Sequence, residues 1–548
     1  MIHAESADTI RTMPLRLHNT LTRRVEPLRV RDPRRVTFYT CGPTVYDDAH
    51  IGNFRSFLAA DVLRRFVESP LCTLEGDSVG GGRQVTHVMN ITDVGHMTDD
   101  DQADGAGEDK MAVAGRRIAE AKKSGKLPAD AKIDPSDPYQ IAEFYANRFL
   151  EDARKLGLKV AIDAQKDPTL MPRATASVPG MIAVIALLIE RGHAYVIGNP
   201  GSRVVYFDVR SFPAYGTLSG NTLDQLREGA GGRIAEANQS GKKHPADFLL
   251  WKEDPSHIMK WESPWGAGYP GWHIECTVMS AARLATHSAG GKLDGLSIPD
   301  AQPIIDLHSG GEDNIFPHHE CEIAQSCCAF NASHSGPFAG MWFHPRFLFV
   351  EGAKMSKSKG NFFTARDLFA KGYEPGALRL ELVKTHYRSN ANFTEQGLKD
   401  SQRTIDRWRR FVDTAPSAGD GDRAAREECR RAVSDALMDD LNIAGAMGAL
   451  NAWMGGVSAP AAADIALVRE IDGVFGVLNL ERKAEATTAI GVWIGCDVDA
   501  AVEAKLAERV EAKKAKDFAR SDAIRDELAK RGYAIKDVAG GKVEVRKA

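Results

Sequence analysis

The chain has 548 residues, of which 43% are hydrophobic and 26% charged, with eight cysteines and a formal net charge of −4 at pH 7. This length and composition indicate a soluble globular protein of several domains, and the near-neutral charge excludes a globally basic surface, so nucleic acid would have to bind at local basic patches. Because the sequence has no apolar run of about twenty residues, no N-terminal leader and no regular cysteine framework, we expect a cytoplasmic protein without a membrane span or a disulfide scaffold.

The first predicted unit is a strand, a loop and a helix over residues 36–68. A β-branched and aromatic run over 36–41 predicts the strand, and apolar residues at helical spacing predict the helix. The loop ends in His50-Ile51-Gly52-Asn53, at the N-terminus of that helix. Free backbone N–H groups and the helix dipole favour a phosphate at such a place. Gly52 allows a nucleotide to lie close to the backbone, and His50 offers a hydrogen bond to a phosphate oxygen.

The remaining elements follow in chain order. A second buried strand is predicted over 84–92, and a Gly-, Asp- and Lys-rich insertion with one short helix over 97–138. Helix and hairpin patterns over 168–252 indicate a separate module inserted into the first domain. A lysine-rich motif at 354–358 precedes a long region of helical pattern, and the chain ends in two charged helices and a hairpin.

Two cysteines and a His-Glu pair form a candidate metal site. His318 and Glu322 follow Pro317 at a spacing of four residues, which puts both side chains on one face of a helix start. Cys41, beside the first motif, and Cys276 could complete a tetrahedral site. Spacing alone leaves an alternative open, in which both cysteines are small buried hydrophobes and His318 belongs to a satisfied helix start.

Several motifs together resemble the cysteinyl-tRNA synthetase family of bacterial type, within the class I aminoacyl-tRNA synthetases. They are CGPTVYD at 41–47, NITD at 90–93, WESPWG at 261–266, GWHIEC at 271–276, PHHECEIAQS at 317–326 and KMSKSKGN at 354–361. The resemblance runs from about Val36 to the C-terminus, with 97–138 as its least family-like part. It implies that Cys41, Cys276, His318 and Glu322 are ligands of one Zn²⁺ per chain.

The activity that the resemblance implies is ATP-dependent activation of L-cysteine, followed by transfer of the cysteinyl group to the 3′-terminal ribose of tRNA(Cys). ATP would act as its Mg²⁺ complex. The family's catalytic groups fall on His50, Lys354 and Lys357, which would neutralise charge on the phosphates. A thiolate binds Zn²⁺ far better than a hydroxyl does, so zinc would select cysteine over serine, and we expect no editing domain.

The resemblance also implies the residues that bind ATP and the amino acid. The ATP site would be formed by His50, Gly52, Asn53, Asp313 and Lys357. Thr92 and Trp272 would contact cysteine, with plain core packing as the alternative for both. Asp313 has a helix cap as its alternative role.

Asn53 departs from the family, whose first motif ends in a second histidine. Asparagine donates hydrogen bonds but carries no charge, and its alternative role is a bond to the local backbone.

The fold class that we predict is α/β. A split, doubly wound parallel-sheet nucleotide-binding domain carries an inserted module and precedes a helical bundle and a small α+β C-terminal domain. The predicted segments are an N-terminal extension (1–35), the first catalytic half (36–167), an inserted connective module (168–252), the second catalytic half (253–350), a lysine-loop and stem-contact region (351–414), a helical anticodon-binding bundle (415–490) and a C-terminal α+β anticodon-binding segment (491–548).

Partners and rival functions complete the sequence-based expectations. Basic runs near Arg403–Arg410 and Lys505–Lys516 are either RNA contacts or solvated helix faces. The family expectation is a monomer. One rival function is a ligase that joins activated cysteine to an amino sugar, which the residues beyond about Ala415 disfavour. The other is a non-catalytic tRNA-binding paralogue, which the retained lysines and metal-ligand candidates disfavour.

Overall fold

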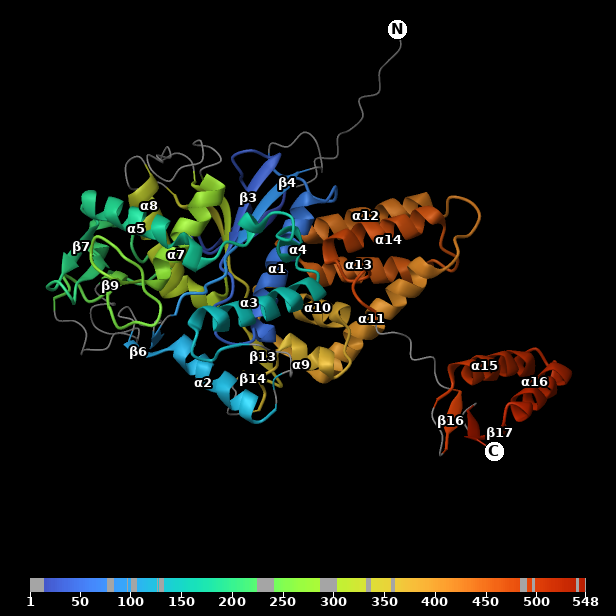
Figure 1. The fold of residues 1–548 in the computed structure, drawn as a ribbon. Helices are drawn as coiled ribbons and strands as arrows, with labels where there is room; N and C mark the ends of the chain where they lie inside the picture. The colour runs from blue at the N-terminus through green and yellow to red at the C-terminus, as the bar shows by residue number, and fades with distance from the viewer. Residues whose placement is uncertain are drawn as a thin grey trace, which may run out of the picture. The chain divides into compact units, whose positions relative to one another are not determined.

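A four-stranded parallel sheet lies at the centre of the first of two units, Met1–Glu481, in the computed structural model (Figure 1). Its strands are β3 (Arg35–Thr40), β4 (Gln84–Met89), β11 (Ile305–Ser309) and β12 (Ala339–Phe343), in the order β12-β11-β3-β4. The structure describes residues 14–75, 83–95, 97–99, 106–125, 127, 133–223, 241–285, 303–331, 337–355, 360–482, 490–494, 498–538 and 542–547.

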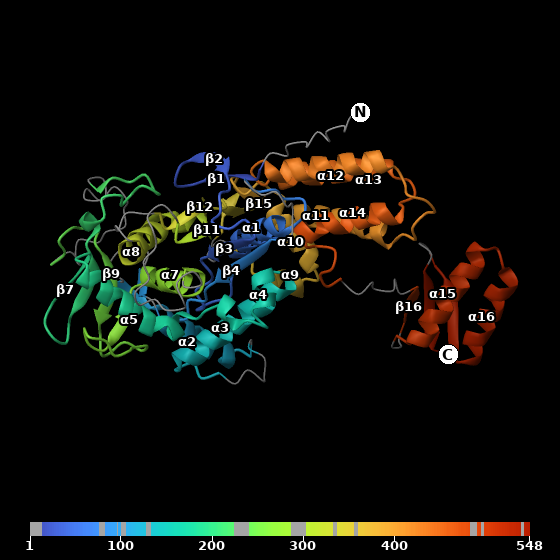
Figure 2. The same cartoon turned by 90° about the horizontal axis from the view of Figure 1, so that it is seen from above.

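The order of the strands reverses between β3 and β11. From β3 the chain continues to β4 on one side, and from β11 it continues to β12 on the other side. Connections that leave in opposite directions open a crevice at the carboxyl ends of the two strands, where doubly wound sheets bind ligands. The loops that begin at Cys41, after β3, and at Gly310, after β11, therefore leave the sheet at this point. Figure 2 shows β3 and β11 side by side.

Alternation along the strands places a core on each face of the sheet. On β3, Phe38 packs in the core that contains helix α1 (Ile51–Glu68), whereas Tyr39 packs in the core that contains α7 (Trp272–Ser280). On β12, Met341 and Trp342 divide in the same way. The predicted strand–loop–helix–strand unit and the doubly wound sheet are thus confirmed.

Further helices and short strands belong to the first unit, and the strands form separate small sheets. The helices, besides α1 and α7, are α2 (Lys110–Lys123), α3 (Pro138–Lys155), α4 (Lys159–Asp163), α5 (Ala174–Glu190), α8 (Glu320–Phe330), α9 (Ala365–Ala370) and α10 (Pro375–Val383). The short strands are β1 (Arg16–Asn19), β2 (Arg24–Pro27), β5 (Met97–Asp99), β6 (Ala106–Asp109), β13 (Leu348–Val350), β14 (Ala353–Lys354) and β15 (Ala391–Phe393).

A separate antiparallel sheet occupies the region of the predicted insertion. Its order is β10-β9-β8-β7, with β7 (Ala194–Ile197), β8 (Val204–Phe207), β9 (Phe248–Glu253) and β10 (Gly268–Pro270). The segment boundary expected after residue 252 falls inside β9, and β10 lies beyond it. The sheet extends past that boundary because β9 pairs with both β8 and β10.

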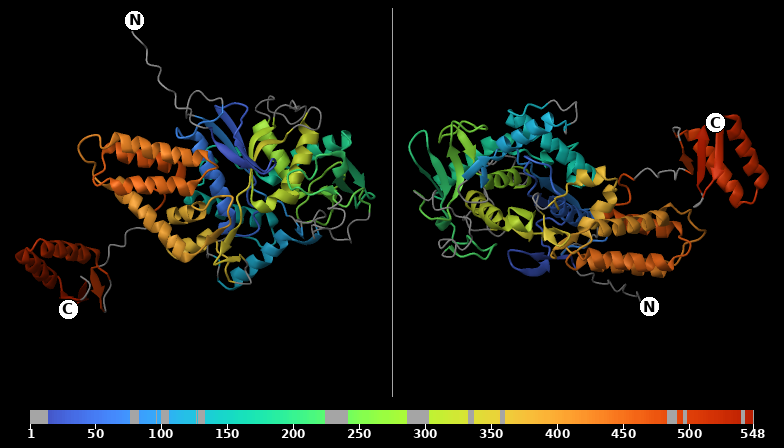
Figure 3. Two further views of the ribbon diagram at one scale, coloured as in Figure 1. Left: turned by 180° about the vertical axis from the view of Figure 1, so that it is seen from behind. Right: turned by 90° about the horizontal axis from the view of Figure 1, so that it is seen from below.

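Four helices form the bundle expected in the C-terminal third, as Figure 3 shows from two sides. They are α11 (Glu395–Asp413), α12 (Arg423–Met438), α13 (Ile443–Gly456) and α14 (Ala462–Phe475). The bundle begins with α11, before residue 415, and α1 packs on both α10 and α14. Helix α1, which begins at the His-Ile-Gly-Asn motif, is therefore in direct contact with the bundle.

The second unit, Arg482–Ala548, has its own small core. Helices α15 (Ala500–Lys514) and α16 (Phe518–Lys530) pack with a sheet of order β16-β18-β17, formed by β16 (Gly491–Trp493), β17 (Tyr533–Asp537) and β18 (Val543–Lys547). The antiparallel pair β17–β18 is the hairpin that the sequence predicts. Within the described residues of both units, no helix has the length and apolarity needed to cross a membrane.

Candidate active site and metal centre

A cavity of about 660 Å³ lies at the crevice between β3 and β11. Most of the predicted site residues line it, namely Cys41, His50, Gly52, Asn53, Trp272, Asp313, His318 and Lys354. These side chains come from six separate stretches of sequence. The sheet topology brings the residues that follow β3 and those that follow β11 together, because these two strands are neighbours and their loops leave at the same carboxyl edge. Lys354 reaches the cavity from β14, in another sheet.

His50 and Asn53 form a reciprocal capping box at the N-terminus of α1. The backbone N–H of Asn53 donates to His50 Nδ1 at 3.1 Å, and the backbone N–H of His50 donates to Asn53 Oδ1 at 3.1 Å. Because Nδ1 accepts a hydrogen bond, the imidazole proton resides on Nε2. Asn53 thus bonds to the local backbone, as its alternative role anticipates, while it also lines the cavity.

Gly52 and Lys354 both line the cavity. A Cβ atom on Gly52 would lie 2.7 Å from Met355 Cε and 2.9 Å from the His50 ring, so no side chain fits there without a shift. The ammonium of Lys354 lies 5.6 Å from the centre of the Phe347 ring. Lys357, the other predicted lysine, lies outside the described residues.

Asp313 and Thr92 occupy different environments. Asp313 is exposed to the cavity in a 3₁₀ turn, Glu312–Asn314, whose N-cap is Gly311, so Asp313 does not begin that turn. Thr92 is buried and is not part of the cavity wall. Its hydroxyl donates to Glu275 Oε2 at 3.0 Å, directly beside Cys276.

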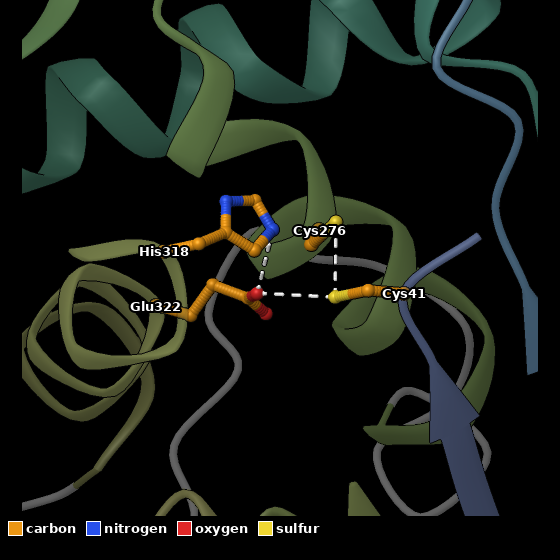
Figure 4. Close-up of side chains that lie close together, drawn as sticks. All are labelled: Cys41, Cys276, His318 and Glu322. Atoms are coloured by element: carbon orange, nitrogen blue, oxygen red, sulfur yellow. Dashed lines mark hydrogen bonds and ion pairs between the residues drawn. The ribbon is translucent and has the colours of Figure 1, made fainter. Parts of the chain in front are cut away.

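Four buried side chains form the candidate metal centre at the edge of this cavity (Figure 4). Cys41 follows β3, Cys276 lies on α7, His318 lies in the π-helical turn Ile315–His319, and Glu322 lies in the first turn of α8. Their donor atoms all lie within 4.8 Å of one another. The sequence pattern placed His318 in the first turn of a helix, and the structure places it in the turn that runs directly into α8. It shares a face with Glu322, as predicted.

The donor atoms are already close in pairs. The two sulfur atoms are 3.7 Å apart, Cys41 Sγ lies 3.4 Å from Glu322 Oε1, and His318 Nε2 lies 3.0 Å from the same oxygen. Sulfur, imidazole nitrogen and carboxylate oxygen in this number are a donor set for tetrahedral Zn²⁺. The chemistry of the residues therefore fits a zinc ion.

Mutual interactions shift the protonation of the cluster. Burial alone lowers the pKa of His318, but the charges of Glu322 and Cys276 outweigh it and raise that pKa to about 10. Burial raises the pKa of Glu322, but His308 and His318 outweigh it and lower that pKa to about 2. Burial raises the pKa of the Cys41 thiol well above its ordinary value. A cation bound among the four donors would offset the charge of the carboxylate and of the sulfurs once these are deprotonated.

Further buried histidines surround the metal centre. His319 Nε2 lies 3.2 Å from Cys41 Sγ, His308 Nε2 lies 3.0 Å from Glu322 Oε2, and the Nδ1 atoms of His273 and His318 are 3.0 Å apart. The set Cys41, His308, His319 and Glu322 would also satisfy a metal, and it shares two ligands with the first set. Sequence analysis did not single out His308, which lies within β11, or His273, which lies within the motif GWHIEC at 271–276.

Three further cysteines and the two basic runs lie outside the metal centre. Cys321 lies 3.4 Å from the Tyr215 hydroxyl and outside the metal cluster, and Cys72 and Cys429 are buried as well. Basic residues of both predicted runs are engaged in ion pairs with acidic neighbours, among them Arg403, Arg409, Lys505, Arg509 and Lys513.

A doubly wound sheet with a His-Ile-Gly-Asn helix and a lysine loop at its switch point is the catalytic fold of the class I aminoacyl-tRNA synthetases. The LeuRS–tRNA–LeuAMS ternary complex from Agrobacterium radiobacter shares this fold, with a TM-score of 0.50 at 11% identity over 95% of this chain and 97% of that one. A family model described as the tRNA synthetases class I (C) catalytic domain matches residues 27–403, and one for the cysteinyl-tRNA ligase anticodon binding domain matches 496–546.

Curated relatives are similar over nearly the whole chain. A cysteine–tRNA ligase from Chlorobaculum tepidum is 38% identical over 96% of this chain and 98% of the relative. Those from Salinibacter ruber and Thermus thermophilus are each 37% identical over 96% of this chain, covering 97% and 98% of the relatives. The chain belongs to the cysteine–tRNA ligase family.

Proposed function

We propose that this chain activates L-cysteine with ATP and Mg²⁺ and transfers the cysteinyl group to tRNA(Cys), and that a zinc ion on Cys41, Cys276, His318 and Glu322 selects the amino acid. The observation that carries this proposal is the position of the four donors. They lie buried at the edge of the cavity that the two nucleotide motifs line. The metal and the nucleotide site are therefore within reach of one small substrate.

Selection of cysteine needs more than a pocket of the right size, because serine differs from it by one atom. Bound to these four residues, Zn²⁺ would ligate the substrate thiolate directly, which a neutral hydroxyl does poorly. Trp272 stacks on His318 with ring centres 4.3 Å apart and lines the cavity, so it would form the wall against which the amino acid lies. Thr92 would act indirectly, through Glu275.

Activation needs alignment and charge stabilisation, because the cysteine carboxylate is itself the nucleophile. His50 is held by its capping box in the tautomer that donates from Nε2, so it would bond a phosphate oxygen without having to titrate. The N-terminus of α1, Lys354 and Lys357 would balance the charge that develops as pyrophosphate leaves. Asp313 would accept hydrogen bonds from the ribose hydroxyls.

A tRNA acceptor is favoured over an amino sugar by the C-terminal part of the chain. The second unit matches an anticodon binding domain, and full-length relatives are tRNA ligases. We propose that the bundle (415–490) and the terminal segment (491–548) bind tRNA, whose unpaired anticodon bases offer stacking and edge contacts. In this role the chain would act as a cytoplasmic monomer.

The test is transfer of labelled cysteine to tRNA(Cys), with serine as competitor and with a chelator. We expect transfer that ignores serine, about one zinc per chain, and loss of both zinc and cysteine-dependent ATP–pyrophosphate exchange in Cys276→Ser. Cys72→Ser, a buried cysteine outside the cluster, is the matched control and should keep both. Exchange without transfer would instead support the amino-sugar ligase, and a zinc-free chain with full activity would refute the role of the metal.

A further inference from the structure

Arg55 is a buried arginine on α1, two residues beyond Asn53, with only 2% of its surface exposed. Its guanidinium donates to four main-chain carbonyls: those of Arg346 at 3.0 Å, Leu382 at 2.8 Å, His386 at 3.2 Å and Ser389 at 2.8 Å. Burial lowers the pKa of Arg55 to about 10, so the side chain stays charged at neutral pH. Within the part of the chain that the structure describes, no carboxylate neutralises it.

This arrangement costs free energy, because a charge buried without a counter-ion loses its hydration. The same molecule offers a contrast in Arg379, which is also fully buried but pairs with Asp61 at 2.6 Å. Carbonyl groups satisfy the donors of Arg55 without cancelling its charge. The cost of burying this charge suggests that the arrangement of the four carbonyls has a role besides stability.

Two of the four carbonyls lie next to strands of the small sheet that ends in Lys354, and the other two lie at the end of the helix that leads into it. Arg346 is two residues before β13, and Ser389 is two residues before β15. β13 pairs in parallel with β15 and antiparallel with β14, with Phe349 opposite Lys354. Leu382 and His386 flank the end of α10, from which the chain runs to β15. One guanidinium thus fixes the small sheet that ends in Lys354.

The same contacts shape the wall of the nucleotide cavity. Arg346 and Phe347 line the cavity, and the Phe347 ring lies beneath the ammonium of Lys354. The side chain of Arg346 bonds Glu312 at 3.1 Å, beside Asp313. Lysine could not replace Arg55, because its single ammonium cannot reach four carbonyls in a planar fork.

We propose that Arg55 is a positioning residue for ATP. It fixes β13, and through Phe347 and β14 it fixes Lys354, relative to the helix whose N-terminus holds His50. The two nucleotide-binding motifs, more than three hundred residues apart in sequence, are thereby joined at a single side chain. This inference rests on the proposed function, because it assigns a role in the binding of the same ATP.

The test measures the KM for ATP in cysteine-dependent ATP–pyrophosphate exchange by the full chain. Arg55→Lys keeps the charge and loses most of the carbonyl contacts, and we expect it to raise that KM about tenfold. Arg379→Lys is the matched control, since it disturbs an equally buried arginine away from the cavity and should leave the KM within about twofold. The melting temperatures of both variants measure how much stability is lost when a buried arginine is replaced.

A double-mutant cycle with Lys354→Met decides whether Arg55 acts through Lys354. We expect Arg55→Lys to change the KM less than about twofold in the Lys354→Met background, because the group that it positions is gone. Additive effects, or an equal rise of the KM in Arg379→Lys, would overturn the proposal.

If Arg55→Lys does not fold, Phe347→Leu replaces it, because Phe347 is 38% exposed and its loss should be tolerated. We then expect a rise of about threefold in the KM for ATP that disappears in the Lys354→Met background. An unchanged KM for ATP in Phe347→Leu would overturn the proposal that Arg55 positions Lys354 through Phe347. Absence of exchange in the unmodified chain would refute the proposed function instead, so the two failures are distinct.

Discussion

The imidazole of His87 is buried on β4, the edge strand beside β3, and stacks on Phe38 with ring centres 4.4 Å apart. Its Nε2 lies 2.8 Å from the hydroxyl of Thr40, the last residue of β3. Burial lowers the pKa of His87 to about 3, so the folded chain holds it neutral. Single residues of this kind decide how the sheet beneath the site responds to acid.

We predict that His87 makes the folded state less stable as the pH falls from about 6.5 towards 3. In that range the unfolded chain binds a proton that the folded chain does not, and one such proton changes the unfolding free energy by about 1.4 kcal/mol per pH unit. The pH dependence of the unfolding free energy is measured by urea unfolding of the unmodified chain and of His87→Gln between about pH 7 and pH 4. Equal pH dependence in both proteins would contradict the prediction.

Gly52 offers a second test at the scale of one residue, because a methyl group there would meet Met355 and the His50 ring. We expect Gly52→Ala to lower kcat/KM for ATP about tenfold. The same change should leave stability unchanged or raise it by up to about 1 kcal/mol, since alanine favours a helix.

Gly448→Ala is the matched control for that substitution. Gly448 lies on α13, where an added Cβ atom meets nothing within 4 Å. It should stabilise the helix without changing exchange activity. If Gly52→Ala and Gly448→Ala behave alike in ATP–pyrophosphate exchange, the close approach at Gly52 has no role in binding.

At the scale of elements, the strands and helices with strong local patterns were predicted correctly. β3, α1 and β4 follow alternation and helical spacing that each occur within one short window. The expected module boundary is the exception, because β9 crosses it and is held there by its partners β8 and β10. His318 and Glu322 share one face where the turn before α8 runs into that helix, as their spacing predicted.

The capping box of α1 gives a prediction at this scale. We expect Asn53→Ala to lower stability by about 1 kcal/mol, because it removes the side-chain acceptor of the His50 backbone N–H, and to reduce ATP binding, because Asn53 lines the cavity. Asn53→Asp keeps that acceptor and should keep the stability. Asn442→Ala, at the N-cap of α13, should cost similar stability without any effect on ATP. Thermal unfolding and the KM for ATP in exchange separate the two effects.

At the scale of the whole molecule, two units divide the proposed work. All residues of the sheet, the cavity and the metal centre belong to Met1–Glu481, and the core of the second unit is built from its own residues. Activation and tRNA recognition are therefore separable in principle.

We predict that a chain ending at Glu481 folds and retains cysteine-dependent ATP–pyrophosphate exchange within about twofold of the full chain. Transfer of cysteine to tRNA(Cys) should fall about tenfold or more in kcat/KM, because the contacts of the terminal unit with the anticodon are lost. Exchange and aminoacylation assays on the same preparation measure both. Full transfer by the shortened chain would show that residues 482–548 do not contribute to tRNA recognition.

The sequence by itself determined the class of fold, the two nucleotide motifs and, through their resemblance to a family, the four metal-ligand candidates. These depend on local patterns and on residue types at fixed positions. Only the tertiary structure decided that His308, His319 and His273 surround the metal centre and that Arg55 joins two distant motifs. Burial and proximity depend on how segments far apart in the chain pack together, and no pattern within a short window contains that information.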